Sequence, residues 1–244
     1  MKNQKLFFLP LALLLLAGTL AATAPTWQPT VRVFGAMRHF MMQGNLNGTV
    51  ALDTLLRRPH LYALGVAEGL HGELLVWDGA GTLTRTAPKQ GTTTKPAIGS
   101  KAALLVAAQV PRWQAVPVPA AVRTDAALEK LVTRHAARLG LDTTKALPFR
   151  LSGRAQAVHW HVMEWNGPAA KHTMENHKQY AVKGRFANQP VDVLGFFSRH
   201  HQSVFTHHTT FVHLHVRPAG KAFAAHVDSL HFAPGTATLH LPSR

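Results

Sequence analysis

The chain has 244 residues, of which 46% are hydrophobic and 15% charged, and it contains no cysteine. This balance is typical of a folded globular protein, and the lack of cysteine excludes disulfides, thiolate metal sites and a cysteine nucleophile. Twenty-six Lys and Arg against eleven Asp and Glu give a formal net charge of +15. The basic residues are scattered and no nucleic-acid-binding motif occurs, so we expect no nucleic acid partner and attribute the charge to solubility or to attraction of small acids.

The first 24 residues have the pattern of a secretory signal peptide. Lys2 and Lys5 precede an apolar stretch from 6 to 20, and small residues suited to cleavage follow as far as Ala24. The stretch is shorter than the roughly 20 residues needed to span a bilayer. We therefore predict export to the periplasm or the medium, with no membrane association after residues 1–24 are removed. The alternative is an uncleaved anchor.

Residues 25–120 are predicted to form an N-terminal β-rich subdomain. An extended segment over 25–43 is expected to lead through a turn rich in glycine and asparagine to a short helix over 51–56. The polar, turn-rich stretch 88–101 is expected to be a surface loop. Apolar patterns bounded by turn residues predict strands at 61–66, 73–77, 82–85 and 104–106.

The region 121–145 is predicted to connect two subdomains and contains the clearest helix. Thr124 or Asp125 can cap its start, and Gly140 follows its end. Residues 146–244 then form a C-terminal β-rich subdomain. Its expected strands are 149–153, 156–165, 179–187, 191–197, 203–216, 224–232 and 236–241. The fold class is therefore α+β, with two mixed or antiparallel β-rich subdomains and a helix between them.

Histidines are concentrated in the second half of the chain, which holds thirteen of the seventeen. His213 and His215 are two residues apart in an apolar strand, so their side chains point to one face, and His226 lies on the expected returning strand. Three imidazoles, with the fourth position left to water, are typical of a catalytic zinc site. His159 and His161 form a rival pair, and the alternative is a set of half-exposed strand histidines or loose metal binding.

Taken in chain order, these segments resemble the α-acetolactate decarboxylase family, zinc enzymes that produce acetoin. The residues concerned are Gly44 and Gly48 of the turn, Gly72-Glu73-Leu74 followed by Asp78-Gly79, the helix after Thr124, Gly195-Phe196, and His213-Leu214-His215-Val216 with Ala225-His226-Val227. The resemblance extends over roughly residues 30–242. It implies a two-domain fold in which each domain has a sheet, zinc in the cleft between them, and a homodimer.

The resemblance also assigns roles to single residues. His213, His215 and His226 match the three zinc ligands, and Glu73 matches a glutamate that handles protons near the metal. The glutamate is thus the candidate acid that protonates the product.

Two positions depart from the family pattern. The family arginine that would hold the substrate carboxylate falls, counted from Gly153, at His161, which can do so only when protonated and could instead be neutral or a fourth metal ligand. Arg150 and Arg154 lie on the same strand region and are candidates to replace it, Arg150 being preferred. A second family glutamate, in a C-terminal tail, has no counterpart because no carboxylate follows Asp228.

The implied function is zinc-dependent decarboxylation of 2-acetolactate to acetoin, with zinc stabilising the enediolate and a small hydroxy-keto acid as partner. The departures leave two alternatives open. One is a zinc-dependent lyase, isomerase or hydrolase acting on another hydroxy-keto acid. The other is a non-catalytic, histidine-rich periplasmic metal-binding protein, which more than one tightly bound metal per chain would favour.

Overall fold

The computed structural model describes residues 27–87, 91–167 and 180–243. The predicted signal peptide lies outside these ranges, so its existence stays a prediction. No helix within the described ranges has the length and hydrophobicity that a bilayer span requires.

The first half of the chain forms a seven-stranded sheet with the order β1-β7-β3-β4-β5-β6, in which β2 also pairs with β7. All of its strand pairs are antiparallel. The strands are β1 (Arg32–Phe34), β2 (Val50–Ala51), β3 (Leu61–Ala67), β4 (Glu73–Trp77), β5 (Ala80–Ala87), β6 (Gly91–Pro96) and β7 (Lys101–Gln109). The helical segments are α1 (Met37–Gln43) and the short 3-10 turns η1 (Leu52–Thr54) and η2 (Glu68–Leu70).

The second sheet also has seven strands, ordered β11-β12-β13-β9-β14-β8, with β10 on β9. The strands are β8 (Arg112–Pro117), β9 (Leu147–Met163), β10 (Ala181–Phe186), β11 (Gln189–Phe197), β12 (Val212–Pro218), β13 (Ala225–Phe232) and β14 (Thr238–Ser243). The first half of β9 pairs with β11 and β14, and its second half pairs with β13 and β10. β11 also pairs with β12, and β12 pairs with β13. The four strands β9, β11, β12 and β13 therefore form a closed ring of paired strands.

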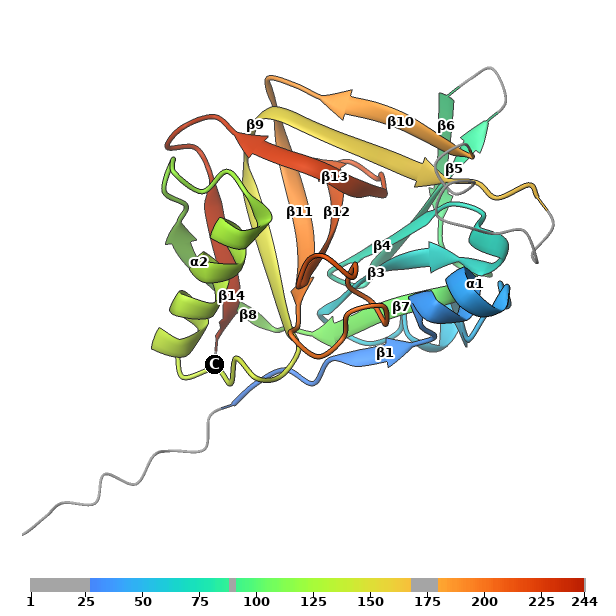
Figure 1. Ribbon diagram of the computed structural model, residues 1–244, viewed down its shortest axis with the longest axis horizontal. Coiled ribbons are helices and arrows are strands. Elements are labelled where there is room, and N and C mark those ends of the chain that lie inside the picture. The colour runs from blue at the N-terminus through green and yellow to red at the C-terminus, as the bar shows by residue number, and fades with distance from the viewer. Residues whose placement is uncertain (1–26, 88–90, 168–179, 244) are drawn as a thin grey trace, which may run out of the picture.

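Figure 1 shows the two sheets side by side, with α2 (Asp125–Arg138) on the side of the second sheet that faces away from the first. The helix begins after Thr124, whose side chain accepts a hydrogen bond from the Ala127 amide. Its apolar face, including Leu128, Leu131 and Val132, packs into the core of the second sheet. The expected α+β class and the existence of a helix after Thr124 are thus confirmed.

Three local expectations were wrong. Residues 37–43 are helical rather than extended, because Met37, Phe40 and Met41 have helical spacing and turn one apolar face to the core. Part of the expected loop 88–101 is the edge strand β6, whose threonines favour extended backbone although their side chains are mostly exposed. The strand expected at 203–216 begins only at Val212.

The two sheets do not divide at residue 120, the boundary expected from the sequence. β8, which precedes that boundary, pairs with β14 in the second sheet through the register Val116 to Leu239. The chain therefore crosses from one sheet to the other between β7 and β8, before the helix rather than after it.

A shared apolar layer joins the sheets. Leu64 and Val66 of β3 and Leu75 of β4 belong to one cluster with Met163 of β9 and Phe196 of β11. Alternate residues of each strand point to opposite faces, so the neighbours of these side chains enter separate cores. Polar side chains on the strand faces that form this shared apolar layer are therefore brought together between the two sheets.

One buried carboxylate ties the end of β9 to the first sheet. Glu164, whose side chain is 7% exposed, lies 2.8 Å from Nδ1 of His71 and accepts a bidentate hydrogen bond from Arg85. The backbone amide of Thr86 also donates to it, over 3.3 Å. These bonds hold the end of β9 in place, and with it Met163, which belongs to the shared apolar layer.

We expect the substitution Glu164→Gln to lower the free energy of unfolding by about 2–3 kcal/mol, because a buried acceptor of several charged hydrogen bonds is lost. The matched control is Asp78→Asn. Asp78 pairs with His60 over 3.2 Å, but the side chains are 54% and 50% exposed, so about 1 kcal/mol or less should be lost. Urea unfolding of both variants measures the difference, and equal losses would contradict the structural role of Glu164.

Candidate metal centre

Three strands of the second sheet bring four histidines together. His215 on β12 is the register partner of His226 on β13, which is in turn the partner of His161 on β9. His213 lies two residues before His215 and shares its face, as the spacing predicts. The apolar neighbours Leu214 and Val216 point into the opposite core. All four imidazoles thus face the layer between the sheets.

The nitrogens of three of these histidines lie at distances suited to a metal ion. Each of His213, His215 and His226 offers one ligand atom, and the three atoms lie within 4.8 Å of one another. Nε2 of His213 and Nδ1 of His226 are 3.1 Å apart. Zn–N bonds of 2.0–2.1 Å in a tetrahedral site place two ligand nitrogens about 3.3 Å apart, so this pair already has nearly the required separation.

The protonation state of His215 also fits a metal ligand. Its Nδ1 donates to the Leu74 carbonyl over 3.0 Å, which leaves a lone pair on Nε2 of the neutral ring. The residue is 1% exposed, and Nε2 makes no hydrogen bond to any described residue. A buried nitrogen of this kind needs a partner, and a metal ion would supply one.

Burial favours the uncharged form of His213 and His215. It lowers the pKa of His213 to about 4 and the pKa of His215 well below its ordinary value. Neutral imidazole nitrogens are ligands that suit zinc, as they also suit copper, iron and nickel. The three residues therefore fit the zinc ion that the sequence resemblance implies.

Glu73 is the first residue of β4 in the first sheet, and its side chain reaches the histidine triad of the second sheet. Its side chain is 5% exposed, and Oε2 lies 3.5 Å from Nε2 of His215. Oε1 accepts a hydrogen bond of 3.3 Å from the Met163 amide. Burial raises its pKa to about 7, an effect that the charge of His161 and the Met163 amide reduce. Glu73 can therefore hold a proton near neutral pH, as a general acid must.

This shift predicts a pH dependence of stability in the metal-free protein. The folded pKa of about 7 exceeds the ordinary 4.5, so between these pH values the folded chain binds the proton that the unfolded chain releases. Stability must then fall as pH rises from 4.5 to 7, by about 3 kcal/mol for this group, and stay level above. We expect the difference in unfolding free energy between the parent and Glu73→Gln to follow this course in urea titrations. A difference independent of pH would contradict the buried acid.

His161 is biased toward its charged form. Burial lowers its pKa, but the 2.7 Å hydrogen bond from Nδ1 to Asp228 and the negative charges of Glu73 and Asp228 outweigh burial and raise it. The position at which the resemblance places an arginine is thus occupied by an imidazole that a carboxylate partner helps to protonate.

These groups surround a cavity of about 430 Å³ between the sheets and helix α1. Its polar lining consists of Glu73, His161, Lys183, His207, His213, His226 and Asp228. Sequence reasoning did not select Lys183 or Asp228. Lys183 on β10 is the register partner of His161, and such a pairing follows from sheet register, for which the local sequence carries no signal.

Arg150, expected near the centre, lies elsewhere. Its guanidinium carbon is within 5.6 Å of the ring centres of Tyr62, Trp77 and Trp113, and its NH1 donates to the Tyr62 hydroxyl over 3.1 Å. It is not among the residues that line the cavity. The reason is distance along β9, because eleven residues separate Arg150 from His161, or roughly 36 Å of extended strand.

The rival pair of histidines is not assembled into a metal site. Nδ1 of His159 bonds to the Ser229 hydroxyl over 2.9 Å, and the residue does not line the cavity that His161 enters.

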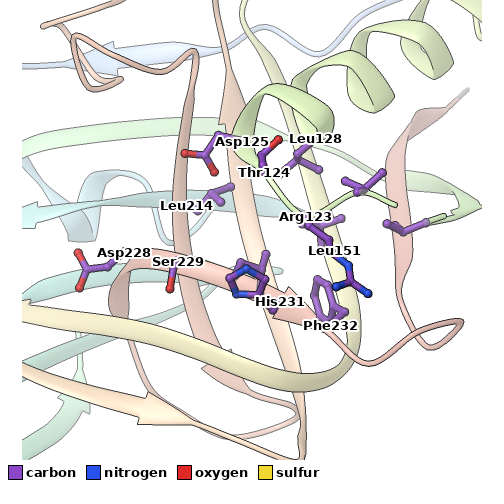
Figure 2. A pocket seen from close by; sticks show the side chains of 13 residues that line it. Arg123, Thr124, Asp125, Leu128, Leu151, Leu214, Asp228, Ser229, His231 and Phe232 are labelled. Atoms are coloured by element: carbon purple, nitrogen blue, oxygen red, sulfur yellow. The ribbon is translucent and has the colours of Figure 1, made fainter. Parts of the chain in front are cut away.

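A separate, smaller hollow of about 210 Å³ lies between the start of α2 and β13 (Figure 2). Thr124 and His231 line it together with Asp228, which borders both hollows. None of the described histidines outside the triad joins a comparable group of three ligands.

Comparison with known proteins bears on the fold. No family model matches the chain, and no curated protein matches it in sequence. Two crystal structures of α-acetolactate decarboxylase do match, each over 88% of this chain and 86% of the other. The enzyme of Bacillus subtilis strain 168 has 14% identity and a TM-score of 0.68, and that of subspecies spizizenii has 15% and 0.70.

A Staphylococcus aureus protein of unknown function, described as similar to α-acetolactate decarboxylase, matches with 14% identity and a TM-score of 0.65. This match covers 88% of the present chain and 85% of that one. The chain therefore has the fold of the α-acetolactate decarboxylases, as the sequence resemblance implied.

Proposed function

We propose that the protein is a zinc-dependent carboxy-lyase that converts 2-acetolactate to acetoin in the cavity between its two sheets. The observation that carries the proposal is the juxtaposition of three imidazoles with a buried, protonatable glutamate, in a fold that acetolactate decarboxylases share. His213, His215 and His226 would hold the metal. When bound, zinc supplies a Lewis acid that withdraws electrons from substrate oxygens.

The remaining chemistry is assigned to side chains of the chain itself. Loss of carbon dioxide breaks a C–C bond and leaves its electron pair on the substrate, and one proton must then reach carbon to give acetoin. Glu73 is the proposed donor, because burial holds its proton near neutral pH and it lies beside the metal ligands. His161, whose charged form Asp228 favours, and Lys183 line the same cavity and would bind the substrate carboxylate before it leaves.

The substitution Lys183→Gln is expected to raise KM roughly 10-fold or more with little change in kcat, because a charged hydrogen bond to the substrate is lost. Arg185→Gln is the matched control. Arg185 is an exposed residue two positions further along β10, outside the cavity lining, and its substitution removes the same charge. Steady-state kinetics at constant ionic strength compare the two. An equal rise in KM would mean that only the net charge matters.

Acetoin formation from racemic 2-acetolactate, measured with zinc and after removal of zinc by a chelator, tests the proposed reaction. Zinc-dependent acetoin supports it. A protein that binds one zinc tightly and forms no acetoin would refute it and favour another hydroxy-keto acid as substrate. Several tightly bound zinc ions without turnover would favour a metal-binding protein, as the abundance of histidines allows.

We further propose that the protein is exported and acts as a homodimer. The basic start and apolar stretch of residues 1–24 support export, and the sequence resemblance supports the dimer. Sequencing of the N-terminus of protein recovered from culture medium or periplasm tests the first proposal, and light scattering tests the second.

A further inference from the structure

The lining of the cavity is largely apolar beside its polar groups. Met37, Phe40 and Met41 of α1 form one part of this apolar wall, and residues of the two sheets and their connections, among them Val66, Leu104 and Met163, form the rest. The cavity volume of about 430 Å³ falls within the range of about 300–1,000 Å³ that is usual for pockets holding drug-sized ligands. By contrast, 2-acetolactate is a five-carbon acid whose apolar parts are two methyl groups. The wall offers far more apolar surface than these methyl groups can cover.

Helix α1 is a fixed part of this wall. The amides of Met37 and Arg38 donate to the carbonyls of Val204 and Ser203 over 2.7 and 3.0 Å. Phe40 is 4% exposed and belongs to the apolar layer between the sheets. The half-buried methionines on either side of it have unbranched, flexible side chains, which adapt to apolar groups of different shape.

The polar and apolar parts of the cavity together describe one kind of ligand. Lys183 and His161 would bind a carboxylate, and a metal held by the histidine triad would bind neighbouring oxygens, whereas the wall formed by α1 would pack against a hydrocarbon group attached to them. We propose, building on the decarboxylation proposed above, that the preferred substrate is a 2-hydroxy-3-oxo acid with an apolar substituent larger than methyl. This substituent is an alkyl chain of several carbons or an aromatic ring and packs against Met37, Phe40 and Met41.

Binding of unreactive acids tests the apolar site separately from catalysis. Calorimetric titration of the zinc-loaded protein would use straight-chain 2-hydroxy acids from 2-hydroxypropanoate to 2-hydroxyoctanoate, which lack the 3-oxo group. Each added CH2 group should tighten binding about twofold to fourfold, the upper value corresponding to full burial. Affinity that does not change with chain length would overturn the inference.

Two glutamine variants locate the effect. Met41→Gln places a polar group of similar length in the wall and should abolish most of the gain per CH2 group. Met42→Gln is the matched control, because Met42 is 81% exposed on the same short helix and does not line the cavity. A gain that is unchanged in Met41→Gln would also overturn the inference.

Turnover of 2-alkyl-2-hydroxy-3-oxobutanoates, with the alkyl group lengthened from methyl to pentyl, separates this inference from the proposed function. A kcat/KM that rises with chain length supports both. A kcat/KM that is highest for 2-acetolactate and falls with each added carbon overturns the inference and leaves the decarboxylase proposal intact. If affinity for the 2-hydroxy acids rises with chain length but no oxo acid is decarboxylated, the apolar site stands and the proposed reaction fails.

Discussion

Replacement of His215 by alanine is expected to abolish stoichiometric zinc binding and, with it, decarboxylation. The ring is 1% exposed, and its hydrogen bond to the Leu74 carbonyl directs the free Nε2 toward the other ligands. Without it only two imidazoles remain. Zinc affinity should therefore fall by more than the 10- to 100-fold that is typical when an outer hydrogen-bond partner of a ligand is lost.

Competition with a chromophoric chelator measures this loss. His159→Ala is the matched control, because His159 is a histidine of the same sheet that bonds to Ser229 outside the cavity. Its zinc affinity should equal that of the parent. Circular dichroism of the metal-free variants checks that the fold is retained. A folded His215→Ala variant that still binds one zinc with parental affinity would refute the assigned site.

The substitution Glu73→Gln is expected to lower kcat by 10²- to 10⁴-fold while zinc binding is retained, because the variant lacks the proton to be delivered. The glutamine can still accept the hydrogen bond from the Met163 amide, so the local structure should survive. In the parent, activity should decline as pH rises through the pKa of Glu73, which is about 7 in the metal-free protein. The residual activity of the Glu73→Gln variant should not show this decline with rising pH.

The matched control for this substitution is Glu68→Gln. Glu68 is an exposed glutamate whose carboxylate accepts a hydrogen bond from the Gly48 amide outside the cavity lining. It should leave kcat and the pH profile unchanged. A Glu73→Gln variant with near-parental kcat would show that another group, such as His161 with Asp228, donates the proton.

The elements that could be predicted from the sequence depend on local periodicity. The helix Asp125–Arg138 has both a capping residue and an apolar face, and the alternation around His213 and His215 places both side chains on one face of a strand. These patterns need no knowledge of distant partners. The expectation that His226 lies beside the pair required a returning strand, and the register of β12 and β13 confirms that placement.

What could not be predicted depends on contacts between distant segments. Lys183 lies opposite His161 only through the register of β10 and β9, and Asp228 reaches the same ring from β13. Arg150 was misplaced because a continuous strand of 17 residues carries its two ends to different parts of the molecule. Helix α1 was mistaken for extended chain because it is held by distant segments: the carbonyls of residues 203 and 204 accept hydrogen bonds from its first two amides, and its apolar face packs on the layer between the sheets.

Titration of the metal-free protein with zinc, following acetoin formation from 2-acetolactate at each addition, tests the central claim most directly. The account predicts no acetoin without metal, a rate that rises in proportion to added zinc, and a break at one zinc per chain. Zinc bound at this stoichiometry with no acetoin at any point, or acetoin formed at full rate without metal, would contradict the claim that the histidine triad and Glu73 form a decarboxylase site.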